Sequence, residues 1–158
     1  MLHGHGHRLR GLRGPPDPAQ ETPPCDLDVL ARRYRCRRCA AVIVVVPREV
    51  LPRRHYGASS VGLALALFAL LGQSTAAVRA RLSTWRIVGD AAVAGGWITL
   101  RRWIDAVRRG ELFGSLLRPP DAWSRRQVAE STALRLMDLA PFEGAVEFRA
   151  FAGAALAR

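Results

Sequence analysis

Two cysteines in the segment Cys36-Arg-Arg-Cys39 have the spacing of half a tetrahedral zinc site. Thiolates placed this way on a tight turn form the knuckle of a zinc ribbon. A closed structural site takes four ligands, and the natural candidates for the other two are His3, His5 and His7, with Cys25 as a substitute. Of these, His5 and His7 are the predicted pair. The alternative is a knuckle that holds no metal. A redox role is less favoured, because a strand rather than a helix is expected after the second cysteine.

Arginine is concentrated around the same turn, with Glu49 as the one acidic residue in that window. Guanidinium groups neutralise phosphates and release counterions from nucleic acid, and Tyr34, His55 and Tyr56 are interleaved with them. The alternative is a solvated basic surface, since all 24 basic residues of the chain are arginines. The candidate phosphate-binding residues here are Arg32, Arg33, Arg35, Arg37, Arg38, Arg48, Arg53 and Arg54.

The segment 97–109 is predicted to be an amphipathic helix with tryptophan and aliphatic residues on one side. Its other side presents Arg101, Arg102, Arg108 and Arg109, as a recognition helix would. A preceding helix over 75–82 would cross the phosphate backbone with Arg79 and Arg81. The alternative is an ordinary surface helix. Asp105 is expected to pair with Arg101 or Arg109 at helical spacing.

No catalytic motif is found in the sequence. A Gly-rich phosphate loop, a nucleophile elbow and an HExxH motif are all absent. The acidic residues fall on expected helices and caps rather than on the strands that carry a nuclease carboxylate cluster. We therefore expect a protein that is not an enzyme.

Composition allows one ordinary domain and favours polyanionic partners. The chain has 158 residues, 49% of them hydrophobic, and a formal net charge of +11, which attracts DNA, RNA or an anionic membrane surface. Three cysteines are an odd number, which argues against a disulfide scaffold and for a reducing compartment. The longest apolar run, 61–72, is too short to span a bilayer. We expect a cytoplasmic protein without a membrane span.

The predicted fold class is α+β. We expect a small zinc-ribbon-like β-hairpin followed by a mainly helical domain. We predict an irregular arm over 1–28, the hairpin over 29–50 and helices over 57–156, with a helix-turn-helix-like segment over 74–109. Ser59 or Ser60, Ser74 and Ser124 are expected to cap helices, and 90–94 to form a further helical turn. The expected core is Leu63, Leu67, Phe68, Leu71, Trp85, Trp97, Leu100, Trp103 and Ile104.

The segment from Arg32 to Tyr56, RRYRCRRCAAVIVVVPREVLPRRHY, resembles an uncharacterised bacterial domain family. That family is similar to the N-terminal zinc-ribbon and helix-turn-helix part of insertion-sequence transposases. The resemblance continues through 61–71, 85–89, 96–103 and 110–113. It implies a zinc knuckle at Cys36 and Cys39, and DNA binding in a mobile-element context. The chain departs from the family pattern in having no second cysteine pair.

The leading hypothesis is a non-catalytic DNA-binding protein of transposase-accessory type. It requires the arginines of the hairpin and of the 97–109 helix to converge on one face. The alternative is a protein-interaction module, or a degenerate transposase fragment, with no nucleic-acid partner.

Overall fold

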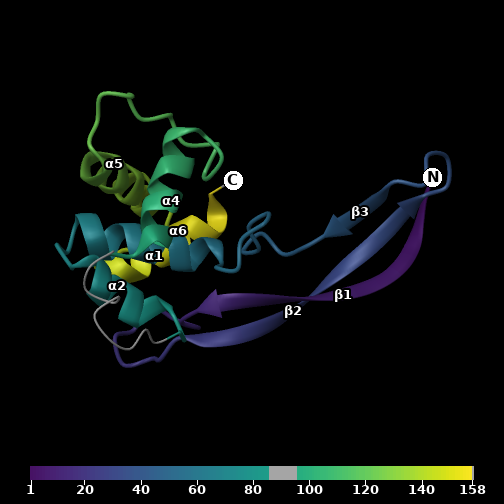
Figure 1. The fold of residues 1–158 in the computed structure, drawn as a ribbon, viewed down its shortest axis with the longest axis horizontal. Helices are drawn as coiled ribbons and strands as arrows, with labels where there is room; N and C mark the ends of the chain where they lie inside the picture. The colour runs from purple at the N-terminus through teal and green to yellow at the C-terminus, as the bar shows by residue number, and fades with distance from the viewer. Residues whose placement is uncertain (86–95, 158) are drawn as a thin grey trace.

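The computed structural model describes residues 1–85 and 96–157, as a three-stranded antiparallel sheet beside a bundle of helices (Figure 1). The strands, in spatial order, are β1 (Leu2–Gly14), β2 (Cys25–Cys36) and β3 (Val42–Val45). The described helices are α1 (Ala58–Ala69), α2 (Thr75–Leu82), α4 (Ile98–Arg108), α5 (Arg125–Asp138) and α6 (Val146–Leu156). The α+β class expected from the sequence is confirmed. The helical turn predicted at 90–94 lies outside the described residues.

Strand β1 occupies a segment that the sequence predicted to be irregular. It pairs with β2 from Leu2, opposite Cys36, to Gly14, opposite Cys25. The irregular arm predicted over 1–28 is therefore wrong for residues 2–14. The prolines begin only at Pro15, so none interrupts the strand. Pairing along the whole of β2 outweighs the weak strand propensity of a segment rich in His, Gly and Arg.

Strands β2 and β3 form an antiparallel hairpin, with Arg32 opposite Val45 and Arg35 opposite Val42. This hairpin lies where the sequence predicted one, and the turn between its strands carries the two cysteines. Strand β2 begins earlier than expected, at Cys25, because its first half pairs with β1. Strand β3 is an edge strand, and all four of its side chains are exposed.

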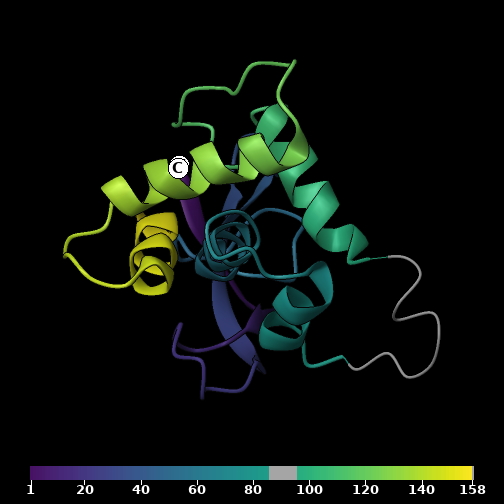
Figure 2. The ribbon, with the colours of Figure 1, turned by 90° about the vertical axis from the view of Figure 1, so that its left-hand side faces the viewer.

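Helix α1 is the centre of the bundle. All of its residues from Ala58 to Leu67 are buried, as expected for a helix that is apolar on every side. Figure 2 shows α1 end-on, with α2, α4, α5 and α6 around it. Among the described residues, none of the helices is long and apolar enough to cross a membrane.

Two of the three predicted serine caps are formed. The cap predicted at Ser59 or Ser60 is wrong, because α1 begins at Ala58 with Gly57 as its N-cap residue. Ser74 Oγ accepts a hydrogen bond from the N–H of Ala77 at 3.2 Å, and Ser124 forms a capping box with Gln127. The predicted core is wrong at two positions: Leu71 is 41% exposed and Trp85 is 63% exposed. Both residues follow the end of a helix, where the chain has left the buried face.

The helix-turn-helix arrangement predicted for 74–109 is not confirmed. Helices α2 and α4 both pack against α1. The connection between them runs from Ser83 to Trp97, which is much longer than the three- or four-residue turn of that motif.

Candidate nucleic-acid interface

An open cleft of about 420 Å³ lies where the sheet meets α2 and the start of α4. Its walls come from the end of β1, from residues 53–56, from α2 with the residues after it, and from the first turns of α4. No acidic residue is among the described residues that line it. Five arginines line the cleft: Arg13, Arg53, Arg54, Arg79 and Arg102.

Strand β1 holds one wall of the cleft in place. The N–H of Arg13 donates to the carbonyl of His55 at 2.6 Å. The guanidinium group of Arg10 donates to the carbonyls of Leu51 and Arg54, at 2.8 and 3.3 Å. These bonds attach the segment that carries Arg54 to the end of β1, so two of the segments that line the cleft are held directly to each other.

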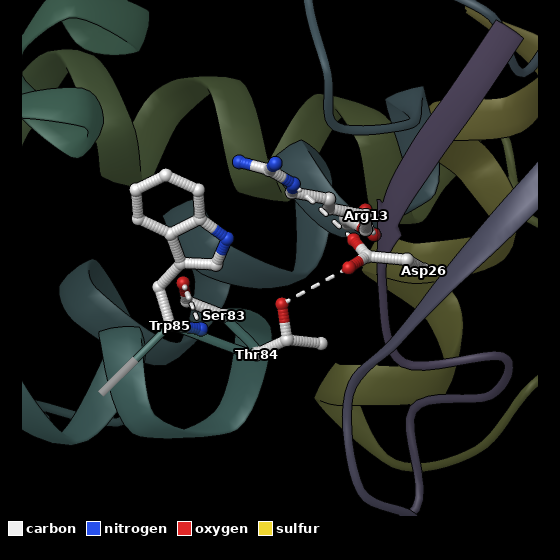
Figure 3. A network of polar contacts seen from close by, with 6 residues as sticks. Arg13, Asp26, Ser83, Thr84 and Trp85 are labelled. Atoms are coloured by element: carbon white, nitrogen blue, oxygen red, sulfur yellow. Dashed lines mark hydrogen bonds and ion pairs between the residues drawn. The ribbon is translucent and has the colours of Figure 1, made fainter.

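Trp85 is the exposed aromatic residue of this site (Figure 3). The guanidinium group of Arg13 lies 4.8 Å from the centre of its ring. Asp26 accepts hydrogen bonds from Arg13 Nε at 3.2 Å and from Thr84 Oγ1 at 3.4 Å, and the N–H of Trp85 donates to Ser83 Oγ at 3.2 Å (Figure 3). Because its backbone is held in this way, the indole ring is a surface on which a nucleobase could stack.

Three buried aromatic residues of the cleft lining pack against one another. Tyr56, Trp97 and Trp103 meet edge to face, with ring centres 5.0 to 5.8 Å apart. This is the preferred geometry of aromatic pairs. The wall that contains Tyr56 is therefore packed directly against α4, which carries Arg102.

Several charges in the cleft are not neutralised. In residues 1–85 and 96–157, the guanidinium groups of Arg53, Arg54 and Arg102 make no hydrogen bond or ion pair. Partial burial lowers the pKa of Arg54, and the nearby charge of Glu111 opposes that shift. An arginine side chain remains positively charged even when it is partly buried in a protein. Cations gathered in a cleft with no acidic lining attract a polyanion.

Comparisons with protein-family models, with curated proteins and with solved structures give no match. The resemblance to the transposase N-terminal region therefore stays a prediction from the sequence.

The arginines predicted on the 97–109 helix separate into different environments. Arg102 lines the cleft, whereas Arg101 does not. The guanidinium group of Arg108 donates to the carbonyl of Trp123 at 2.5 Å, and Arg109 forms two hydrogen bonds to the carboxylate of Glu111. Arg108 and Arg109 therefore have partners within the chain and lie outside the cleft. Their contact with nucleic acid stays a prediction.

Asp105 pairs with a different helix from the one expected. Its carboxylate accepts hydrogen bonds from Arg125 of α5 at 3.1 and 3.2 Å, rather than from Arg101 or Arg109. These bonds lower the pKa of Asp105. The pair joins α4 to α5, a tertiary contact that helical spacing within α4 could not reveal.

The hairpin arginines lie away from the cleft. Among the candidates, Arg53 and Arg54 line it with Arg102, whereas those of β2 and its turn are not in its lining. Alternation along β2 also places Arg32 on the opposite face of the sheet from Arg33 and Arg35. The single basic face that the hypothesis required is therefore not formed. The hairpin arginines give that hypothesis no support, and only the arginines of the cleft can carry a proposal of DNA binding. The hairpin residues outside the cleft are Arg32, Arg33, Arg35, Arg37, Arg38 and Arg48.

Sequence reasoning missed two residues of the cleft, Arg13 and Trp85. Arg13 fell in the predicted arm, and Trp85 was assigned to the core. One signal was present: the neighbours of Trp85, Ser83-Thr84 before it and Arg86 after it, are polar, which is more typical of an exposed residue than of a buried one.

The cysteine turn lies at the other end of the sheet from the cleft (Figure 1). Backbone N–H groups of Cys39 and Arg38, and the Cys39 thiol, form hydrogen bonds with the Cys36 thiol and lower its pKa. In the part of the chain that the structure describes, no three His, Cys, Asp or Glu residues are grouped so as to hold a metal ion. The structure therefore does not group His5 or His7 with Cys36 and Cys39, and zinc binding by these residues stays a prediction.

Proposed function

We propose that this protein binds DNA without catalysing a reaction, and that the arginine-lined cleft is its phosphate-binding site. The observation that carries the proposal is the set of five arginines, brought together from four segments, in a cleft with no acidic residue among its described lining. A phosphate chain would displace counterions as it enters, which gives binding a steep dependence on salt.

Trp85 adds a second element to the proposal. Basic grooves with an exposed aromatic residue bind nucleic-acid strands with little sequence preference, because every base has a face that can stack. The transposase-accessory context implied by the sequence resemblance is part of the same proposal. In that context, tolerance of many sequences is a useful property.

The test is a titration of the protein with fluorescently labelled DNA over a series of salt concentrations. The double variant Arg53→Ala/Arg102→Ala is expected to bind more weakly and to lower the slope of log K against log salt by about 1.8 on duplex DNA, since each lost phosphate contact contributes about 0.9. Neither side chain has a partner within the described chain, so the fold should be retained.

The matched control is Arg8→Ala/Arg48→Ala. It removes the same charge from two exposed side chains that lie outside the cleft and, like Arg53 and Arg102, have no partner among the described residues. Equal weakening by the two double variants would show that net charge, rather than the cleft, holds DNA.

A protein-interaction module is the second candidate function. It is favoured by the exposed apolar side chains of β3, from Val42 to Val45, because an uncovered edge strand can pair with another chain. The same titration separates the two functions. Negligible binding of the wild-type protein at low salt would remove the first proposal and leave the second.

A further inference from the structure

The turn between β2 and β3 is a free tip of the molecule. Cys36 ends β2 opposite Leu2, at the end of the sheet that points away from the helices (Figure 1). Cys39 is exposed and Cys36 half-buried, and the residues from Arg37 to Val45 are all exposed. The tip can therefore approach another molecule without disturbing the bundle.

The tip also has the conformation of a zinc knuckle. The Cys36 thiol forms hydrogen bonds with the N–H groups of Arg38 and Cys39 and with the Cys39 thiol, so the two sulfur atoms lie together. The N–H of Ala40 donates to the carbonyl of Cys36 at 3.0 Å, and Ala40 has a φ of 58°. A left-handed alanine costs about 1–2 kcal/mol. That strained residue closes the turn directly after Cys39.

Residues 1–85 and 96–157 do not group two further ligands with the thiols. His3 is the nearest histidine in the sheet, but it lies opposite Arg35, so its side chain is on the other face from that of Cys36. Zinc holds nitrogen at about 2.1 Å and sulfur at about 2.3 Å. His7 lies opposite Arg32, four residues along β2 from Cys36, which is about 13 Å at the rise of a strand. Cys25 lies at the far end of β2. Within the described residues, no third His, Cys, Asp or Glu is grouped with the thiol pair.

We propose that two copies of this chain meet tip to tip and hold one zinc ion between them, through Cys36 and Cys39 of each copy. A second copy supplies what is missing, because it presents the same two sulfur atoms at an equally exposed tip. Four thiols each release one proton to solvent as they bind. The resulting centre carries a formal charge of −2, since one Zn²⁺ meets four thiolates. Arg37 and Arg38 of both copies stand beside it and offset that charge.

The test measures zinc content and mass of the full-length, untagged chain in reducing buffer. We expect one zinc ion for every two chains, and a mass in solution of two chains that falls to one on addition of a chelator. Cys36→Ser and Cys39→Ser should each give a zinc-free monomer. Cys25→Ser is the matched control and should remain a zinc-bound dimer.

Three outcomes would overturn the proposal: a monomer with one zinc ion per chain, a dimer that survives the chelator, or no zinc bound on titration with zinc chloride. A folding defect is recognised separately, because the tip does not pack on the helices: Cys36→Ser should keep the helical circular dichroism and thermal unfolding of the chelated wild type. The Arg53→Ala/Arg102→Ala variant should still bind zinc and form the dimer. Failure of the DNA proposal can therefore be distinguished from failure of the zinc proposal.

Discussion

The side chain of Glu49 acts as the cap of helix α1. The N-cap residue, Gly57, has no side chain to accept a hydrogen bond. Glu49 fills that role from the preceding segment: its Oε1 accepts from the N–H of Ser59, and its Oε2 from the Ser59 hydroxyl, both at 2.9 Å. Burial raises the pKa of Glu49, although the two hydrogen bonds oppose the shift. The segment held in this way leads into the arginines of the cleft.

Two substitutions separate the hydrogen bonds of Glu49 from its charge. Glu49→Ala leaves the N–H of Ser59, a buried residue, without its acceptor, and should lower the free energy of unfolding by about 1–2 kcal/mol. Glu49→Gln keeps an acceptor and removes a partly desolvated charge, so at pH 7 its stability should lie within about 0.5 kcal/mol of the wild type.

The dependence on pH has a definite sign. Because the pKa of Glu49 is raised in the folded state, the folded chain binds its proton more tightly than the unfolded chain does. The stabilisation that comes from this tighter proton binding is fully present at pH values below the pKa of the unfolded chain, about 4.3. It is lost as the pH rises through the pKa of the folded chain. Relative to the wild type, Glu49→Gln should therefore gain stability between pH 4 and pH 7.

Urea unfolding followed by tryptophan fluorescence at these two pH values measures all three proteins. A Cβ atom at Gly57 would overlap the Glu49 carboxylate, so Gly57→Ala provides an independent check. The double variant Glu49→Ala/Gly57→Ala should be less destabilised than the sum of its single changes. Strict additivity, or a Glu49→Gln variant as unstable as Glu49→Ala, would refute this account of the cap.

Two further predictions concern the bundle and the cleft. Gly153→Ala should lower the free energy of unfolding by about 1–3 kcal/mol in the same urea assay, because its Cβ would overlap the backbone carbonyl of Leu136 on α5; unchanged stability would mean that α5 and α6 do not cross so closely. Trp85→Ala should weaken binding of single-stranded DNA by about 1–3 kcal/mol, measured by anisotropy at fixed salt, whereas Trp85→Phe should keep most of the affinity; equal losses in the two variants would exclude stacking.

Local signals in the sequence were sufficient for most of the helices. A serine followed by a helix-forming segment predicted the starts of α2 and α5, and both caps are present. Such caps depend only on residues two or three positions apart. Pairing of distant segments leaves no such signal, and for that reason β1 was missed: nothing within 2–14 shows that β2 lies alongside it.

The cleft was predictable only in part for the same reason. Arg53, Arg54 and Arg102 were identified by their neighbours in sequence, but what joins them is tertiary: Arg10 attaches the 51–54 segment to β1, and Tyr56 packs against the tryptophans of the α4 region. Arg108 has a partner that sequence could not reveal either, because it donates to the carbonyl of Trp123, which lies outside the helix.

Arginines that are concentrated in one stretch of the sequence do not gather at one place in the structure. Strand β1 has 13 residues, which at the rise of a strand separate its two ends by about 40 Å. Arg13 is at the cleft, whereas Leu2 faces Cys36 at the tip. At salt near physiological, where exposed charges are screened beyond about 8 Å, the two groups of cations cannot act on the same phosphate. In the two proposals made above, the cleft arginines bind a phosphate chain and the tip arginines offset the charge of a metal–thiolate centre. Each role can therefore be removed by substitution without affecting the other.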